Sequence, residues 1–233
     1  MTRHLPQTLL VLAALAVAVV GYTIWGNYET TFRYRLTATV ESGGQFYTGN
    51  GVIQVQIILQ RLSFSGHASL PKVTGDAVVV DVPGRSPIFF LLSADGNVDW
   101  DANIAFTMFR QLLPDPARAK ETAENISAMV RLEARAEIPR DSYPRMVAFE
   151  DVQRPASVYE VFPDDLSRPL DPGARVVSLT IDMTRDQVST GIVEAKLPWL
   201  VTLEAHLDGD PYQTTGSGFA NTISRVDFVK RGL

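Results

Sequence analysis

The 233-residue chain contains no cysteine. This absence excludes disulfides, thiolate zinc sites, iron–sulfur clusters, a cysteine nucleophile and a lipid-bearing cysteine. The chain also lacks the Gly-x-Ser-x-Gly motif of many hydrolases and the Gly-Lys-Ser/Thr loop that cradles phosphates. We therefore assign no catalytic, cofactor-binding or metal-binding residue from the sequence, and we expect no cofactor.

Histidine is scarce, with His4, His67 and His206 as the three examples. None of them has a second histidine at the H-x-x-x-H spacing of a metal site. A hydrolytic site that joins His67 or His206 with Ser65 or Asp208 would have to be assembled by folding from distant residues. We expect ordinary surface or hydrogen-bonded histidines.

The chain has no concentration of basic charge. Arg3 is the only Lys or Arg before residue 29, and the remainder carries 20 Lys and Arg against 26 Asp and Glu. Nucleic-acid binding needs a basic face. We therefore expect no nucleic-acid partner.

Charged residues are also absent from residues 5–28, and residues 9–20 consist of Leu, Val and Ala alone. About 20 apolar residues cross the ~30 Å hydrocarbon core of a bilayer. Tyr22, Trp25 and Tyr28 lie at the far end, where aromatic rings favour the headgroup region. We predict one N-terminal transmembrane helix as an anchor over residues 1–28. A cleaved signal peptide is the alternative, because Ala14-Leu15-Ala16 has the small-x-small form of a cleavage site.

Residues 29–233 are expected to form a single β-rich extracytoplasmic domain. A very short N-terminal tail usually stays in the cytoplasm, as in signal sequences. The predicted location is therefore the bacterial inner membrane, crossed once, with the C-terminal domain in the periplasm.

Alternating apolar and polar residues predict a long antiparallel hairpin at the start of this domain. Every second residue over 32–40 is apolar, and a second alternating run follows at 53–60. A period of two is typical of half-buried strands. Ser42-Gly43-Gly44 marks the turn between them.

The pattern then changes twice. Residues 77–82 and 88–92 predict a second hairpin, buried on both faces. Ile104, Met108 and Leu112 share one face of a predicted helix that Asp99 or Asp101 caps, and Asp115-Pro116 predicts the start of another helix running to residue 130. Further strands are predicted at residues 146–149, 158–162, 176–183, 191–197, 199–207 and 219–229. The predicted fold class is α+β, mostly antiparallel β in a sheet or partly closed barrel, with a two-helix insert.

Several short patterns resemble a known group of proteins. They are Phe32-Arg33-Tyr34-Arg35, Thr190-Gly191-Ile192 and Leu197-Pro198-Trp199-Leu200. In this combination the chain resembles a group of uncharacterised membrane-anchored proteins of alphaproteobacteria. The resemblance implies a membrane compartment and no chemistry, and it carries over no functional residue.

Four segments deserve comparison with functional motifs. Residues 95–101 place aspartates at alternate positions, as in a calcium loop, but the sixth position is Trp100 and the twelfth is Phe106. We expect a polar turn there. The Gly-rich segment 214–219 lies between predicted strands and is expected to be a loop. Glu150-Asp151 and Asp164-Asp165 are adjacent carboxylates whose side chains diverge, so neither is expected to act as an acid–base pair.

The apolar segment 197–200 has two interpretations. Trp199 either fills the core, which we prefer, or anchors a partner. For the whole protein we expect a non-enzymatic, membrane-tethered envelope protein that interacts with another envelope protein or has a structural role. A domain that binds a lipid or small apolar ligand is one alternative, and a hydrolase is another.

Overall fold

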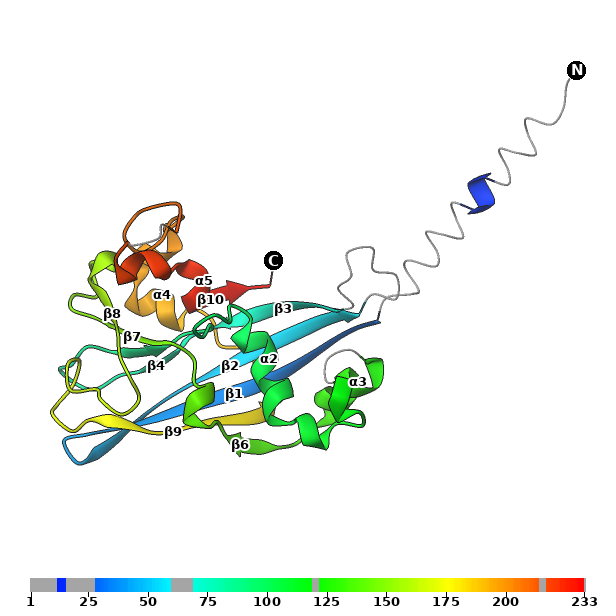
Figure 1. Ribbon diagram of the computed structural model, residues 1–233, viewed down its shortest axis with the longest axis horizontal. Coiled ribbons are helices and arrows are strands. Elements are labelled where there is room, and N and C mark those ends of the chain that lie inside the picture. The colour runs from blue at the N-terminus through cyan, green and yellow to red at the C-terminus, as the bar shows by residue number, and fades with distance from the viewer. Residues whose placement is uncertain (1–11, 16–27, 60–68, 119–121, 214–216, 233) are drawn as a thin grey trace, which may run out of the picture.

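The computed structural model describes residues 12–15, 28–59, 69–118, 122–213 and 217–232. Two antiparallel sheets organise this part of the chain (Figure 1). The larger sheet has the strand order β10-β3-β2-β1-β9-β6, and the smaller has the order β4-β5-β7-β8. Neither sheet closes on itself. The predicted α+β, mostly antiparallel fold is therefore confirmed, whereas the partly closed barrel is not what forms.

The strands of the larger sheet are β1 (Tyr28–Ser42), β2 (Gln45–Leu59), β3 (Ser69–Asp76), β6 (Arg135–Glu137), β9 (Arg175–Thr184) and β10 (Val229–Arg231). Those of the smaller sheet are β4 (Val78–Val80), β5 (Ile88–Phe90), β7 (Met146–Phe149) and β8 (Val158–Glu160). Both predicted hairpins are confirmed, as β1–β2 and β4–β5. Strand β2 begins earlier than the alternation indicated, at Gln45, and β3 and β6 were not predicted.

The first predicted helix is α2 (Trp100–Met108), which a 3-10 turn, η1 (Arg110–Leu112), follows. Asp99 occupies the position before the helix, but its side chain makes no capping hydrogen bond. The second predicted helix is wrong at its start. Asp115 precedes only the 3-10 turn η2 (Pro116–Arg118), and α3 (Ala123–Arg131) begins after Thr122, whose hydroxyl accepts a hydrogen bond of 3.1 Å from the Asn125 N–H.

Three predicted strands near the C-terminus are wrong. Residues 191–197 contain the helix α4 (Ile192–Lys196), residues 199–207 begin with η5 (Pro198–Val201), and residues 219–229 contain η6 (Phe219–Thr222) and α5 (Arg225–Phe228) before β10. The remaining 3-10 turns are η3 (Arg140–Ser142) and η4 (Pro155–Ser157). These short helices bury Val193, Leu197, Leu200, Ile223 and Phe228 against the smaller sheet. The apolar residues of these segments thus pack into the core from short helices. In runs this short, periodicity alone cannot distinguish a helix from a strand.

Asp76 explains why α4 is a helix. Its carboxylate oxygen Oδ2 accepts hydrogen bonds from the backbone N–H groups of Ile192 and Val193, at 2.7 and 3.3 Å. These two groups have no partner within a helix, so the carboxylate satisfies them and fixes where α4 starts.

The core has two parts. The larger cluster lies between the inner face of the larger sheet and α2 and α3, where alternate residues of β1 are fully buried. The second cluster joins the smaller sheet to α4, α5 and η5, with Phe89 and Phe149 edge to face at 5.7 Å. Leu197 and Leu200 are buried, and the half-buried Trp199 donates a 2.7 Å hydrogen bond to the Val152 carbonyl. This segment packs against the core, in line with the preferred interpretation.

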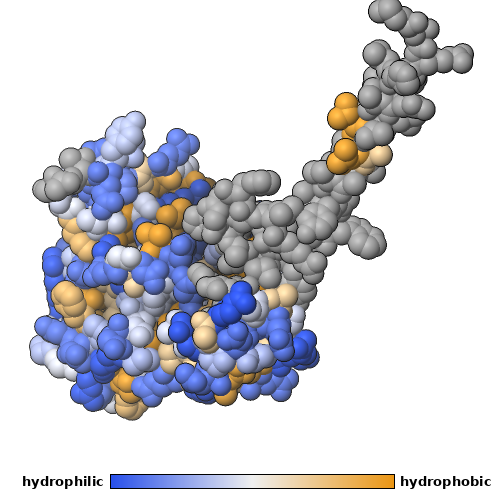
Figure 2. Space-filling model, turned by 45° about the vertical axis from the view of Figure 1, so that its right-hand side comes forward, coloured by the Kyte–Doolittle hydropathy of each residue, from blue (hydrophilic) through white to orange (hydrophobic). Residues whose placement is uncertain are grey.

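On the face that Figure 2 shows, hydrophilic residues predominate and apolar residues are interspersed among them. Residues 12–15 are helical and expose both Leu12 and Leu15. No helix within the described ranges is long and apolar enough to span a membrane. Apart from residues 12–15, the predicted anchor over residues 1–28 lies outside the described residues until β1 begins at Tyr28.

Candidate functional site

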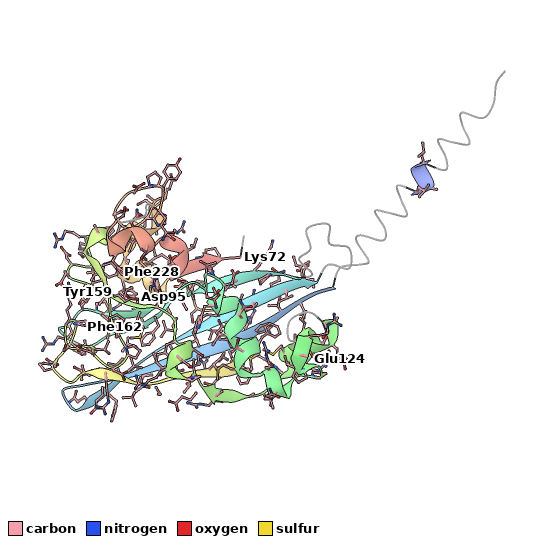
Figure 3. All side chains as sticks on the ribbon, in the orientation of Figure 1. Lys72, Asp95, Glu124, Tyr159, Phe162 and Phe228 are labelled. Atoms are coloured by element: carbon pink, nitrogen blue, oxygen red, sulfur yellow. The ribbon has the colours of Figure 1, made fainter. Side chains whose placement is uncertain are left out.

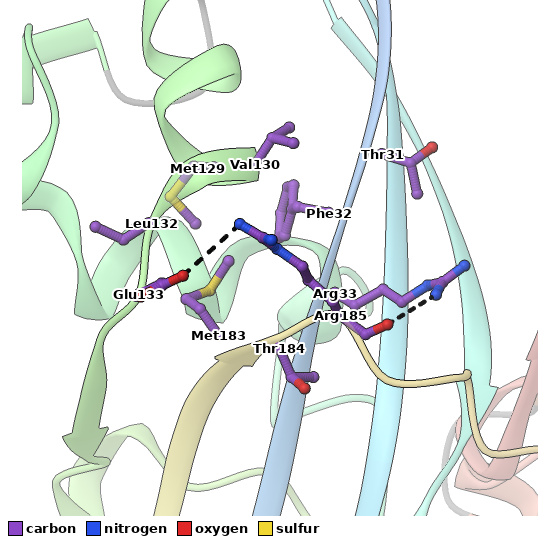
Figure 4. Close-up of a pocket in the computed structure, with 10 residues that line it drawn as sticks. All are labelled: Thr31, Phe32, Arg33, Met129, Val130, Leu132, Glu133, Met183, Thr184 and Arg185. Carbon is purple, nitrogen blue, oxygen red and sulfur yellow. Dashed lines mark hydrogen bonds and ion pairs between the residues drawn. The ribbon is translucent and has the colours of Figure 1, made fainter.

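A groove lies between α3 and the ends of β1 and β9 (Figure 4). We call it the α3 groove. It has a volume of about 690 Å³ and is open to solvent. Its lining comprises Thr31, Phe32, Arg33, Met129, Val130, Leu132, Glu133, Met183, Thr184 and Arg185.

The floor of the α3 groove is apolar because β1, α3 and β9 each turn an apolar side chain toward it. Phe32 lies on the inner face of β1, where its ring meets Phe106 of α2 edge to face at 5.4 Å. Met129 is fully buried on α3, and Met183 of β9 packs against the same cluster while remaining partly exposed. Methionine side chains adapt to irregular apolar surfaces. The floor can therefore accommodate an apolar group of more than one shape.

The rim of the groove is charged. The Arg33 guanidinium donates hydrogen bonds to the carbonyls of Arg185 and Asp186, at 3.4 and 3.1 Å, and to Gln54 Oε1 at 2.9 Å. Arg33 thereby ties β1 to the chain that leaves β9. The Arg185 guanidinium lies 3.7 Å from the Glu133 carboxylate, and both side chains are more than four-fifths exposed. Such an exposed pair contributes little to stability and can rearrange around a ligand.

The chemistry of the α3 groove favours binding. Its described lining contains no histidine and only one carboxylate, Glu133. General acid–base catalysis needs titratable groups positioned for proton transfer. An apolar floor with a charged rim is the arrangement of a binding site.

Of the residues considered above for a hydrolytic site, the structure describes only His206 and Asp208, and no hydrogen bond joins their side chains. His4, His67 and Ser65 lie outside the described residues. The buried Nδ1 of His206 has no hydrogen-bond partner in the described part of the chain. The exposed Asp208 carboxylate accepts its 2.9 Å hydrogen bond from the Asp210 N–H. His206 is therefore not oriented by a carboxylate.

The calcium-like segment 95–101 is a polar turn, as expected, closed by a bridge between Ala94 and Asn97. Its carboxylates diverge: Asp95 pairs with Arg145, while Asp101 turns inward to Lys230. Among the described residues, no three Asp, Glu, His or Cys side chains gather as metal ligands would.

The adjacent carboxylates and the Gly-rich segment considered above can also be located in the structure. Glu150 and Asp151 pair separately, with Arg168 and Arg154, and Asp164 pairs with Arg140 while Asp165 accepts from Ser167. Residues 214–216 of the Gly-rich segment lie outside the described residues, and the rest leads into η6.

Sequence reasoning missed a buried ion pair between α2 and β10. Asp101 is fully buried, and the Lys230 ammonium lies 2.9 Å from each of its carboxylate oxygens. Oδ1 accepts a hydrogen bond, and Oδ2 is held by the ion pair alone. Burial raises the pKa of Asp101 to about 6, although Lys230 opposes that rise. No motif marks two residues 129 positions apart as partners.

Tyr34 lies beside this pair at the centre of the core. Its hydroxyl donates a 2.6 Å hydrogen bond to the Asp101 carbonyl, and burial raises the pKa of Tyr34 well above its usual value. Comparison of the chain with family models, curated proteins and solved structures finds no match.

Proposed function

We propose that the chain is a non-enzymatic, membrane-tethered protein of the bacterial inner membrane, whose C-terminal domain lies in the periplasm and binds another envelope protein. The uncharged residues 5–28 support the tether, since two dozen positions without charge favour acyl chains over water. The exposed Leu12 and Leu15 are in keeping with that environment.

The position of the α3 groove carries the proposed interaction. Thr31, Phe32 and Arg33 follow Tyr28 within five residues along β1. At about 3.3 Å per residue, the groove therefore begins within roughly 20 Å of the proposed tether. A partner embedded in the same bilayer would meet the groove with the first residues that leave its own membrane segment.

The proposed occupant is accordingly the juxtamembrane segment of a second membrane protein. Apolar side chains of that segment would contact Met129 and Met183, and its charged residues would pair with Arg185 or Glu133 in place of their exposed ion pair. A lipid acyl chain is the second candidate, because the same methionine floor suits it.

Photocrosslinking tests the proposal in intact cells. A benzophenone amino acid replaces Val130, which lines the groove and is 40% exposed, in the full-length protein. The matched control replaces Val201, which is 57% exposed on η5 and outside the groove. We expect a discrete protease-sensitive adduct at Val130 alone, and peptide mapping should place it beside a transmembrane segment of the partner.

A second change makes the result specific. Met183→Glu puts a charge on the groove floor and should abolish the adduct without unfolding the domain, because Met183 is partly exposed. An adduct with lipid only would favour the ligand-binding alternative. Equal adducts at Val130 and Val201, or none at Val130, would refute the interaction.

A further inference from the structure

A second pocket, of about 460 Å³, lies on the opposite edge of the larger sheet, between β3, β10, α5 and the start of α2. We call it the β3–β10 pocket. Four basic side chains line it although the chain as a whole is acidic: Lys72, Arg225, Lys230 and Arg231. They come from segments about 150 residues apart in the sequence, so the sequence alone does not indicate that they line one pocket.

Two of these cations are already neutralised. Lys230 pairs with the buried Asp101. Arg231 donates a 2.7 Å hydrogen bond to the buried Asp76 and also pairs with Glu194. These acids lie beneath the pocket and hold the two side chains in place, so Lys230 and Arg231 form part of a fixed wall.

The other two cations have no partner in the part of the chain that the structure describes. Neither Lys72 nor Arg225 makes an ion pair or side-chain hydrogen bond within the described ranges, and the Arg225 Nε is buried with no acceptor. Leaving a buried donor unsatisfied costs free energy, and buried polar groups nearly always have a partner. The pocket therefore presents donors that an external acceptor would satisfy. An arginine beside a lysine suits a phosphate group, which accepts several charge-assisted hydrogen bonds.

A carboxylate faces the same space. Asp99 is exposed, lines the pocket, and forms no ion pair with Lys72 or Arg225 in the described structure. The described lining thus holds positive and negative side chains that are not paired with each other. A simple anion on Lys72 and Arg225 would be repelled by Asp99 in the same pocket. A ligand with a phosphate at one end and an amine at the other satisfies both sides.

We propose that the β3–β10 pocket binds a zwitterionic phosphate ester of the phosphoethanolamine class, with its phosphate on Lys72 and Arg225 and its amine on Asp99. The source is either the free ester or a phospholipid headgroup. In the strand register Lys72 of β3 lies opposite Gln56 of β2, which lies opposite Thr31 of β1. Lys72 thus lies near the end of the sheet where β1 begins (Figure 3). The exposed Val226 at the pocket would suit the carbons of a lipid. This site does not depend on the α3 groove or its partner.

Calorimetric titration of the full-length protein in a non-ionic detergent tests the proposal. The probes are O-phosphoethanolamine, inorganic phosphate, ethanolamine and dihexanoyl-phosphatidylethanolamine. We expect phosphoethanolamine to bind about tenfold or more tightly than phosphate or ethanolamine, since one charge-assisted hydrogen bond is worth at least that factor. Tighter binding of the lipid would identify the headgroup as the source, and tighter binding of the free ester would identify the soluble compound.

Three variants assign the roles. Lys72→Gln and Arg225→Gln should each weaken phosphoethanolamine binding about tenfold. Asp99→Asn should abolish the preference over phosphate without reducing phosphate binding. Lys196→Gln, outside the pocket and paired with Asp81, is the matched control and should change nothing. Circular dichroism confirms that each variant is folded.

The proposal is overturned by any of three results. Neither phosphoethanolamine nor the lipid binds at millimolar concentration. Phosphate binds as tightly as phosphoethanolamine to the wild-type protein. The folded pocket variants bind as the Lys196→Gln control does.

Discussion

Gly49→Ala should be among the most damaging small substitutions in this chain. Gly49 lies inside β2, where β4 of the smaller sheet crosses it. A Cβ at this position would lie 2.0 Å from the Val79 carbonyl oxygen and 2.7 Å from its carbon. Ordinary contact needs well over 3 Å, so the sheets would have to separate by about 1 Å against the packing of both cores. Overpacking costs about 1–3 kcal/mol, and because the obstacle is backbone we expect about 3 kcal/mol.

Gly51 supplies a matched control two residues along the same strand. A Cβ there would meet only the Val78 Cγ2 at 3.5 Å and the Asp76 carbonyl at 3.6 Å, which are ordinary contacts. Gly51→Ala should therefore change stability by less than about 1 kcal/mol. For a domain of this size, 3 kcal/mol corresponds to a fall of about 6–12 °C in Tm. Differential scanning fluorimetry in detergent measures both. If the two variants melt within about 2 °C of each other, the close crossing of β2 and β4 is wrong.

Three further predictions follow from other contacts. Because the pKa of Asp101 is raised to about 6 in the folded protein, protonation of this carboxyl adds to the free energy of unfolding. This addition is complete below about pH 4 and is lost as the pH rises through 6. Urea unfolding should show that, as the pH falls from 7 to 4, the free energy of unfolding of the wild-type protein rises by on the order of 2 kcal/mol relative to that of Asp101→Asn. Relative to Asp141→Asn, which changes an exposed residue, it should not rise. Arg231→Met leaves the buried Asp76 without its cation and should cost about 3 kcal/mol in the same assay, whereas Arg175→Met, which breaks an exposed pair, should cost under about 1 kcal/mol. Alkaline carbonate should leave the full-length protein in the membrane pellet but release a chain without residues 1–28; release of both would refute the tether.

The hairpin at the start of the fold was predictable because the alternation of apolar residues and the glycines of the turn indicate the same strand pairing. Strict alternation over residues 32–40 and the Gly43-Gly44 turn define one register, and the β1–β2 pairing follows it. The missing stretch at the start of β2 contains Gly49-Asn50-Gly51, which argues against a strand on propensity. The β4 crossing explains Gly49, and this contact between two sheets does not show in the local periodicity.

The C-terminal third was mispredicted for a related reason. Residues 191–197 form a short segment with few apolar side chains, and the Asp76 carboxylate that accepts hydrogen bonds from the start of α4 is more than 100 residues away. Both pockets likewise depend on distant segments. The α3 groove needs α3 beside β1 and β9, and the β3–β10 pocket needs residues 225–231 beside Lys72. Neither juxtaposition follows from spacing in the sequence.

The two acids beneath the β3–β10 pocket connect ligand binding to the stability of the fold. Asp76 fixes the start of α4 and pairs with Arg231, while Asp101 lies in the first turn of α2 and pairs with Lys230. The three-residue strand β10 therefore holds helices from both hydrophobic clusters. A ligand that bridges Lys72 on β3 and Arg225 on α5 would link these two segments, and it would do so in the folded state alone. Its binding energy then adds to the free energy of unfolding, by about 2.7 kcal/mol at a hundred times Kd. Conversely, the donors that lack acceptors make this edge of the sheet less stable without the ligand than its dense packing implies.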